Sequence, residues 1–209
     1  MFLAKGKKII KNDSFLYEHC VRIIHELKPE SRDQLREFCV RNGGLQMKTS
    51  QQFAGVGQFN KVTAAAIDAA YAVTAPLHKN KCTAVDEWQS EIDATKRTFI
   101  VNNANPTLLT ENVKTMRHPF AEDVRTKTVE VVPRTHLGSG GWPCNNTTRN
   151  AQNRGDYTSC CIELGIGKSG EGFNDYLEVL KSSNGSLLNI GENDQPLMTV
   201  SAIYVNRHG

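Results

Sequence analysis

The spacing of apolar residues changes near Arg97, and this change constrains the fold more than any other feature of the sequence. Before Arg97 the apolar residues recur at intervals of three and four, as in amphipathic helices. After it, runs such as "TFIV", "TVEVV", "YTSCCIELGI" and "LMTVSAIYV" have the composition of strands. The pattern predicts an α+β fold in one compact unit. A helical region over residues 1–97 packs with a strand-rich, mainly antiparallel region over 98–209.

Start and stop signals divide the helical region into about four helices. They are expected near residues 14–28, 31–42, 49–73 and 83–97. The third depends on the capping-box spacing of Thr49 and Gln52, and the fourth on the helical spacing of Val85, Trp88 and Ile92. In the second region, the spacing from Phe173 to Leu180 predicts one short helix among the strands.

Composition excludes several classes of protein. Hydrophobic residues make up 39% of the chain and charged residues 22%, which is too apolar for an intrinsically disordered protein. The six cysteines show no C-x-x-C spacing, so a reduced, intracellular protein or a virion component is expected rather than a disulfide scaffold. No apolar run is long enough for a signal peptide or a membrane span, and no membrane partner is expected.

One glycine-rich stretch, "IELGIGKSGEG", has the spacing of a nucleotide-binding loop. Gly165, Gly167 and Gly170 match G-x-G-x-x-G between an expected strand and an expected helix. With Glu163 ahead of the glycines, the stretch resembles the first motif of the S-adenosylmethionine-dependent methyltransferases over about thirty residues. The resemblance implies cofactor binding, with Glu192 placed to bind a ribose hydroxyl. A doubly wound sheet, however, needs more βα units than the residues after Gly170 can supply.

A second stretch, "GSGGWP", resembles the loop around a serine-protease nucleophile. Ser139 would need His118 or His136 as a base and Asp123 as the orienting carboxylate. Such a triad comes from widely separated strands of a larger all-β chain, whereas half of this chain has helical spacing. No catalytic residue is therefore predicted. No group of His, Cys, Asp and Glu has zinc-site spacing, so no metal is expected either.

Basic residues gather in two places in a chain whose formal net charge is +3. One is the beginning of the sequence, and the other is an acid-free run after Val131. Charged side chains and amide donors in such runs suit phosphate groups. The residues expected to contact nucleic acid are Lys5, Lys7, Lys8, Lys11, Arg149 and Arg154.

The stretch from Thr135 to Tyr157 is expected to be one long loop inserted between two strands. Loops of this length without structure of their own are uncommon unless they have a function. Trp142, followed by Pro143, is the expected aromatic anchor of an interface with a neighbouring subunit, together with Arg149 and Arg154.

These features lead to one principal hypothesis about function and two alternatives. The principal hypothesis is a self-assembling structural protein, a capsid or other virion component of a virus or phage. It would be a homo-oligomer that contacts nucleic acid and needs no cofactor. The first alternative is an enzyme that uses the Gly165–Gly170 loop to bind a nucleotide or S-adenosylmethionine. The second is a small regulatory or inhibitor protein.

Overall fold

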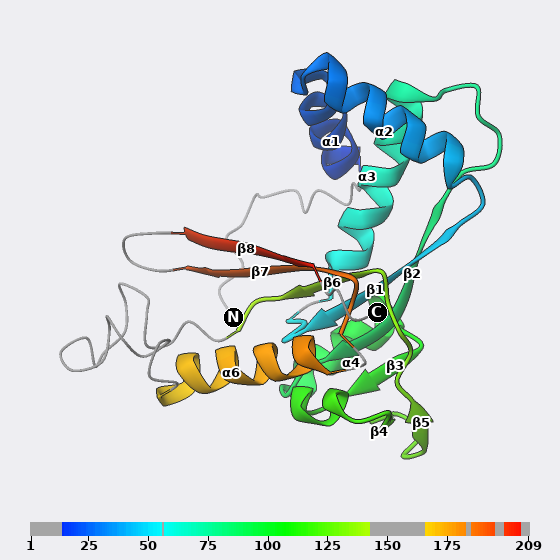
Figure 1. Ribbon diagram of the computed structural model, residues 1–209. Helices are drawn as coiled ribbons and strands as arrows, with labels where there is room; N and C mark the ends of the chain where they lie inside the picture. Colours follow the sequence, from blue (N-terminus) through cyan, green and yellow to red (C-terminus); the bar gives the residue numbers. More distant parts are fainter. Residues whose placement is uncertain (1–13, 56, 143–165, 183–184, 195–198, 206–209) are drawn as a thin grey trace, which may run out of the picture. The chain divides into compact units, whose positions relative to one another are not determined.

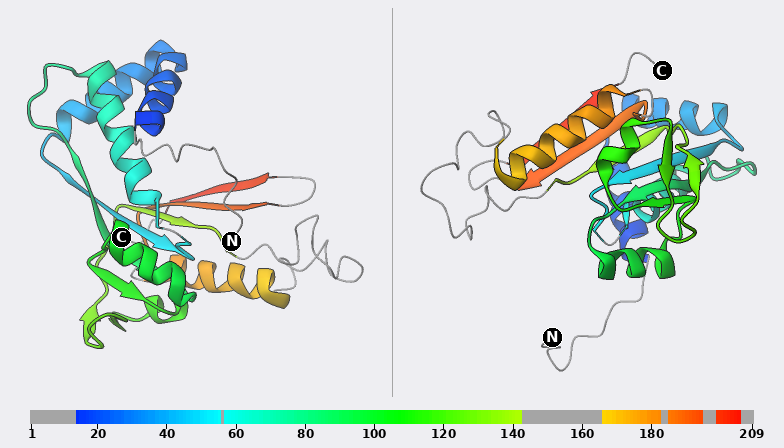
Figure 2. Two further views of the ribbon diagram at one scale, coloured as in Figure 1. Left: turned by 180° about the vertical axis from the view of Figure 1, so that it is seen from behind. Right: turned by 90° about the horizontal axis from the view of Figure 1, so that it is seen from below.

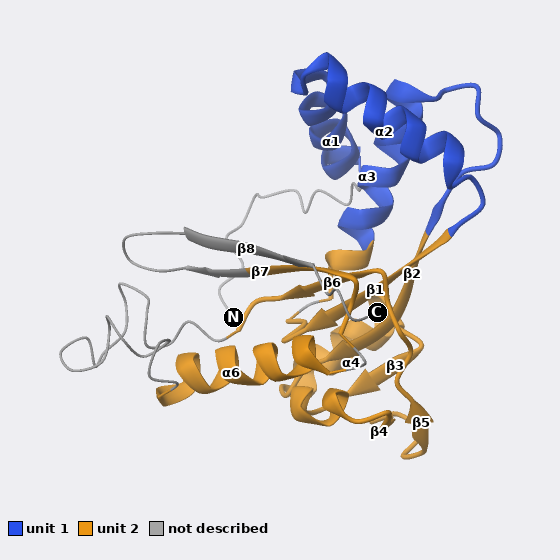
Figure 3. Cartoon of the chain, viewed as in Figure 1, with its two compact units in different colours: residues 1–45, 61–83 blue, residues 46–60, 84–209 orange. Residues whose placement is uncertain are grey.

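The computed structural model describes residues 14–55, 57–142, 166–182, 185–194 and 199–205. Helices and strands alternate along these residues (Figure 1), so the fold is α/β. The expected α+β fold, with a helical half and an antiparallel half, is therefore wrong. The chain divides into two compact units (Figure 3): unit 1 is residues 1–45 and 61–83, and unit 2 is residues 46–60 and 84–209.

Unit 1 is helical. It contains α1 (Ser14–Glu26), α2 (Pro29–Arg41) and most of α3 (Phe59–Thr74). The first two were predicted from the sequence, and α2 begins with a proline at its first turn, where no backbone N–H is needed. The buried Tyr71 joins two segments, because its hydroxyl donates to Cys39 O at 2.8 Å and accepts from Cys82 N at 3.0 Å.

Unit 2 is built on a six-stranded sheet in the order β3-β2-β1-β6-β7-β8. The strands are β1 (Gln46–Gln52), β2 (Thr83–Ser90), β3 (Leu108–Thr110), β6 (Leu137–Gly140), β7 (Leu188–Asp194) and β8 (Thr199–Val205). The pairs β2–β3, β1–β6 and β6–β7 are parallel, and β7–β8 is antiparallel. The bonds Thr83 N to Leu45 O and Ala54 N to Ser90 O keep β1 and β2 parallel as well.

Helices cover both faces of this sheet (Figure 2), as in a doubly wound fold. On one face, Ile100 of α4 (Ala94–Asn103) packs against Leu109 of β3. On the other, Val179 of α6 (Gly167–Lys181) packs in a cluster with Leu108 and Trp88. Leu108 and Leu109 are neighbours in β3 and point to opposite faces, as the alternation of a strand requires.

A small second sheet lies between β3 and β6 in the sequence. After the 3₁₀ helix η1 (Val113–Arg117), strands β4 (Phe120–Glu122) and β5 (Val129–Val131) pair antiparallel. The expected strand "TVEVV" is confirmed as β5, and the strand within "LMTVSAIYV" as β8. The short helix expected from Phe173 to Leu180 is confirmed as part of α6.

Four segments differ from the expectation, and polarity is the main cause. Residues 49–52 of the expected third helix and 83–90 of the expected fourth belong to β1 and β2, which bury polar side chains such as Thr49, Ser50 and Gln89. The later part of the expected third helix, residues 59–73, is confirmed as α3. The expected strand "TFIV" lies in α4, whose first turn is capped by Asp93. Residues 137–140, expected to be loop, form the central strand β6.

Candidate functional site

The order in which successive strands are added to the sheet reverses between β1 and β6. Numbered by their order along the chain, the six strands run 3-2-1-4-5-6, the order of a doubly wound nucleotide-binding sheet. In such sheets a ligand binds outside the carboxyl ends of the strands at the reversal. The described residues there are 53–55, 57 and 58 after β1, those from Glu91 onwards after β2, and Gly141 and Trp142 after β6. All of them belong to unit 2.

The loop after β1 has an unusual backbone. Phe53, Gly55 and Gly57 all have positive φ angles, 52°, 58° and 66°. Glycine adopts this conformation without strain, but phenylalanine does not, and strained residues of this kind cluster at functional sites. A Cβ added at Gly55 would meet no heavy atom within 4 Å, so the loop faces open space at this point.

Glu91, the first residue after β2, holds this loop in place. Its Oε2 accepts the backbone N–H of Gly55 at 2.7 Å, and its Oε1 accepts that of Asp93 at 2.9 Å. Its own N–H donates to Thr110 O at 3.1 Å, which ties the end of β2 to the end of β3. A carboxylate has about four lone-pair positions, so Glu91 can accept further donors from a ligand.

The residues that follow Glu91 form the entry to α4. Ile92 is 75% exposed and offers an apolar surface beside the carboxylate. Asp93 caps the helix by accepting from Thr95 N and Lys96 N, and the bond from Lys96 is the main cause that lowers the Asp93 pKa. Arg97 donates to Glu91 O at 2.9 Å and to Ile92 O at 2.6 Å, so its guanidinium is engaged with the backbone.

The other side of the loop packs on a buried polar pair. A Cβ at Gly57 would lie 2.4 Å from Gln89 Oε1, so the Gln89 amide fills the space beside this glycine. Gln89 Nε2 donates to Asp86 Oδ2 at 2.6 Å. The pKa of Asp86 is raised to about 7, mainly by burial and also by the charge of Glu87, while the hydrogen bond from Gln89 acts in the opposite direction.

Asp86→Asn is expected to make the protein more stable at pH 8 and to change it little at pH 5. Because the Asp86 pKa is higher in the folded state, the folded protein binds a proton between about pH 4 and 7 and the unfolded chain does not. Stability therefore falls as pH rises through this window. The full shift corresponds to about 4 kcal/mol, and we expect about half of that because desolvation is incomplete. Urea unfolding at both pH values measures it, and equal effects at the two would contradict the burial argument.

The segment after β6 leads into an aromatic cluster under α6. Trp142 is 6% exposed, and its ring centroid lies 4.8 Å from that of Phe173 and 5.4 Å from that of Tyr176. Gly140 makes room for Tyr176, since an added Cβ would come 2.4 Å from its ring. Burial raises the pKa of Tyr176 to about 12. Trp142 thus packs in the core of its own chain, and its expected role as an interface anchor stays a prediction.

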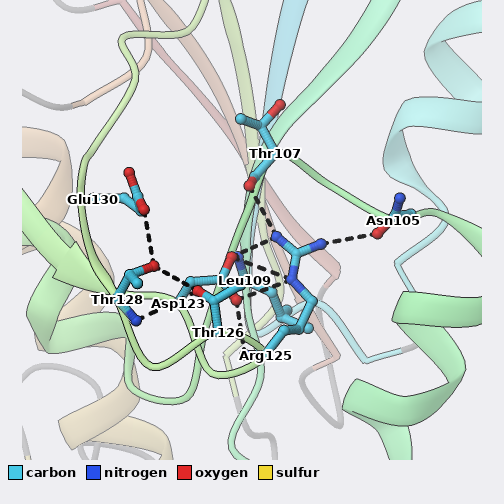
Figure 4. A network of polar contacts seen from close by, with 8 residues as sticks. All are labelled: Asn105, Thr107, Leu109, Asp123, Arg125, Thr126, Thr128 and Glu130. Atoms are coloured by element: carbon cyan, nitrogen blue, oxygen red, sulfur yellow. Dashed lines mark hydrogen bonds and ion pairs between the residues drawn. The ribbon is translucent and has the colours of Figure 1, made fainter.

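A second polar cluster fixes the turn before β5 (Figure 4). Asp123, 3% exposed, accepts from the Nε and Nη2 of Arg125 and from its backbone N–H. Arg125 also donates to Asn105 Oδ1 at 2.8 Å and to Thr107 O at 2.9 Å. Burial alone would raise the Asp123 pKa, but the hydrogen bonds from Arg125 and Leu109 and the charge of Arg125 together lower it. These contacts define the Asp123–Arg125 clasp, a structural element.

Only some of the residues predicted for a cofactor loop lie within the described residues, so this loop stays a prediction. Gly167 begins α6 and Gly170 is buried within that helix. Glu192 belongs to β7, while Glu163 and Gly165 lie outside the described residues. The predicted nucleic-acid and interface residues Lys5, Lys7, Lys8, Lys11, Arg149 and Arg154 also lie outside them.

The protease-like arrangement is not assembled either. Ser139 lies within β6, where it pairs with Gln51 and Ile190. His136 Nδ1 accepts the backbone N–H of Lys48, and Asp123 is held by Arg125. Within the described residues, no three His, Cys, Asp or Glu side chains are grouped so as to hold a metal ion.

Sequence reasoning missed Gly55, Gly57 and Glu91. The two glycines were included in an expected helix, although each costs about 1 kcal/mol there. Their G-x-G spacing directly after residues 46–52, with an acid after the next strand, was the available signal.

Comparison with protein families and with curated proteins does not identify a relative of this chain. The sequence matches no protein-family model, and no curated protein matches it. In the described part of the chain, no helix is both long and apolar enough to cross a membrane.

Proposed function

We propose that this protein is an S-adenosylmethionine-dependent methyltransferase that binds its cofactor at the carboxyl ends of β1 and β2. The observation that carries the proposal is the bond from Gly55 N to Glu91 Oε2, which joins a glycine loop after β1 to an acid after β2. In doubly wound sheets these two features bind the adenosyl part of a cofactor at the reversal of strand order. The proposal keeps the enzyme alternative from the sequence but moves the site from Gly165–Gly170 to Gly55–Gly57.

The residues present fit an adenosyl group. Open space at Gly55 lets a ligand approach the backbone closely. Glu91 is 6% exposed, and its Oε2 and Oε1 already accept from Gly55 N and Asp93 N. We expect a ribose hydroxyl that reaches the exposed part of the carboxylate to donate to one of its unused lone pairs in a strong, short bond. Ile92, exposed next to Glu91, supplies an apolar surface against which a flat adenine can pack.

Charge favours S-adenosylmethionine over a dinucleotide or a nucleoside triphosphate. Residues 53–58 and 91–95 contain no Lys or Arg, whereas Glu91 and Asp93 are acidic. Arg97 is engaged with backbone carbonyls and lies 3.7 Å from Glu111. A phosphate about 6 Å from one of these carboxylates would be repelled by roughly 3 kcal/mol at an effective dielectric constant of about 20. A cationic sulfonium would instead be attracted.

S-Adenosylmethionine and S-adenosylhomocysteine are expected to raise the melting temperature, and NAD and ATP to leave it unchanged. Bound ligand adds about 2.7 kcal/mol at a hundredfold excess over Kd. Glu91→Gln removes the charge and one strong acceptor and should weaken binding at least tenfold by titration calorimetry. Glu122→Gln, at an exposed acid in β4, is the matched control. Stabilisation by NAD rather than by S-adenosylmethionine would contradict the proposal. So would an unchanged affinity of the Glu91→Gln variant for S-adenosylmethionine.

The expectation of a self-assembling capsid or virion protein stays a prediction, because no described contact tests it. Native mass spectrometry of the full chain would decide it independently of cofactor binding.

A further inference from the structure

We infer that unit 1 carries a binding site for the phosphodiester groups of a nucleic-acid backbone, in a hollow between its helices. This site is separate from the cofactor site and does not depend on the proposed methyl transfer. The hollow has a volume of about 310 Å³. It is lined by His25 from α1, Arg32, Asp33 and Arg36 from α2, and Thr74 from α3, together with two apolar residues.

Uncompensated positive charge is the first argument. Arg32 and Arg36 are one helical turn apart on α2, a spacing at which like charges repel. Neither guanidinium forms an ion pair with another residue in the described ranges, although the nearby Asp33 and Glu37 are acidic. Two guanidinium groups without an ion-pair partner among the described residues are suited to the oxygens of a phosphate, which guanidinium groups bind in bidentate geometry.

The charge balance of the two units is the second argument. Unit 1 contains twelve Lys and Arg against seven Asp and Glu, a formal charge of +5. Unit 2 contains thirteen against fifteen, a formal charge of −2. Of the charge of unit 1, +2 belongs to the described residues 14–45 and 61–83, and +3 to residues 1–13, which lie outside the described ranges. Such asymmetry attracts a polyanion to one part of a protein.

The charge in the hollow distinguishes a diester from a free phosphate. Among the Lys, Arg, Asp and Glu side chains that line the hollow, Arg32 and Arg36 contribute two positive charges and Asp33 one negative charge. The balance of +1 matches the single negative charge of a phosphodiester and leaves a dianionic phosphate uncompensated. A second hollow along α2 shares Asp33 and Arg36 and adds Glu37, Val40 and Arg41. Arg41 is a further cation along this helix for a neighbouring phosphate of the strand, and Glu37 offsets its charge. Contacts of this kind bind nucleic acid without reading its sequence.

Fluorescence anisotropy of labelled oligo-dT with the full chain tests the inference. The double variant Arg32→Gln/Arg36→Gln is expected to bind about tenfold more weakly at low salt. Losing two phosphate contacts should also reduce the slope of log K against log salt by about 1.4 for a single strand. Lys127→Gln/Lys181→Gln removes the same charge from exposed positions in unit 2 and should change neither value by a comparable amount.

Two further measurements keep the test decisive. Circular dichroism verifies that the variants fold. If the double variant fails to fold, the single variant Arg36→Gln replaces it, because Arg36 is exposed. This single change is expected to lower the slope of log K against log salt by about 0.7. Inorganic phosphate at matched ionic strength should not displace the oligonucleotide. The inference is overturned if both double variants bind alike, if the wild type does not bind oligo-dT, or if only inorganic phosphate depends on the two arginines.

Discussion

Arg125→Ala is expected to cost about 3–5 kcal/mol of stability, because it leaves the buried carboxylate of Asp123 without its counter-charge. The substitution also removes the bonds from Arg125 to Asn105 Oδ1 and Thr107 O, which connect the turn before β5 to the segment before β3. A domain is typically stable by about 5–15 kcal/mol, so this single change removes a large part of that margin. Urea unfolding at pH 7, followed by circular dichroism, measures the loss.

The control for this prediction is Lys127→Ala. Lys127, two residues after Arg125, forms an ion pair with Glu122, the residue before Asp123. Both side chains are exposed, so we expect a change of about 0–1 kcal/mol. A comparable loss in the two variants would mean that the Asp123–Arg125 clasp contributes no more than a surface pair.

The effect of Arg125→Ala should depend on pH in a defined direction. The pKa of Asp123 is lower in the folded protein than in the unfolded chain, so the unfolded chain takes up a proton first as pH falls. The stability contributed by the clasp is present above about pH 4, the unfolded pKa of Asp, and is lost as pH falls through the lower, folded pKa. The wild type and Arg125→Ala should therefore become more similar in acid. A difference that grows below pH 4 would contradict this assignment.

The helices of unit 1 and α6 could be predicted because their apolar residues follow helical spacing and their ends carry ordinary stop signals. The Gly43-Gly44 pair after α2 and the apolar series from Phe173 to Leu180 are examples. In these elements the local pattern and the tertiary environment favour the same structure.

The central strands could not be predicted because they bury polar residues. Ser50 of β1 lies in a buried cluster of hydroxyls, where it forms hydrogen bonds with Thr135 and Ser186. Those partners are distant in sequence, so no local pattern indicates that the hydroxyl is satisfied. A parallel strand buried on both faces is expected to be apolar throughout, and β1 is not. When these partners are not known, the polar residues of β1 and the apolar residues that follow β1 together have the spacing of a helix.

The glycines of β6 led to a different error, because residues expected to be a loop form a strand. Gly138 and Gly140 have the composition of a loop, yet they lie in the middle of the sheet. They are small because neighbours occupy the space above them: an added Cβ would come 2.1 Å from Asn189 Oδ1 at the first and 2.4 Å from the Tyr176 ring at the second. Close packing from distant residues, which no turn pattern encodes, determined the choice of glycine.

The same cause moved the candidate site. The loop from Phe53 to Gly57 becomes recognisable only when β1 is known to precede it, and Glu91 only when β2 is known to end at Ser90. Since both strands were expected to be helices, the one glycine motif that followed an expected strand was preferred, at Gly165–Gly170. The difference in secondary structure thus explains why the sequence favoured Gly165–Gly170, whereas our proposal uses Gly55 and Gly57.

Trp142→Ala is the second large effect, expected to cost about 3–5 kcal/mol, the usual range for removing a buried tryptophan. The indole packs on Phe173 and Tyr176 of α6 and touches the space beside Gly191 of β7, so the substitution leaves a cavity between helix and sheet. Trp142→Phe keeps an aromatic ring there and should lose less than half as much. Val131→Ala, at a side chain 65% exposed in β5, should change stability by no more than about 0.5 kcal/mol.

Measuring stability and oligomeric state on the same Trp142→Ala sample separates a core role from an interface role. A core residue lowers the urea midpoint while the mass of the folded species, measured by native mass spectrometry at constant concentration, stays the same. An interface anchor does the reverse, because its removal weakens association and leaves the fold of the single chain intact. Since 94% of the Trp142 side chain is already covered by its own chain, little surface remains for a partner to bury. We therefore expect the first result, and an unchanged midpoint with a smaller assembly would show that the aromatic cluster under α6 does not hold this tryptophan.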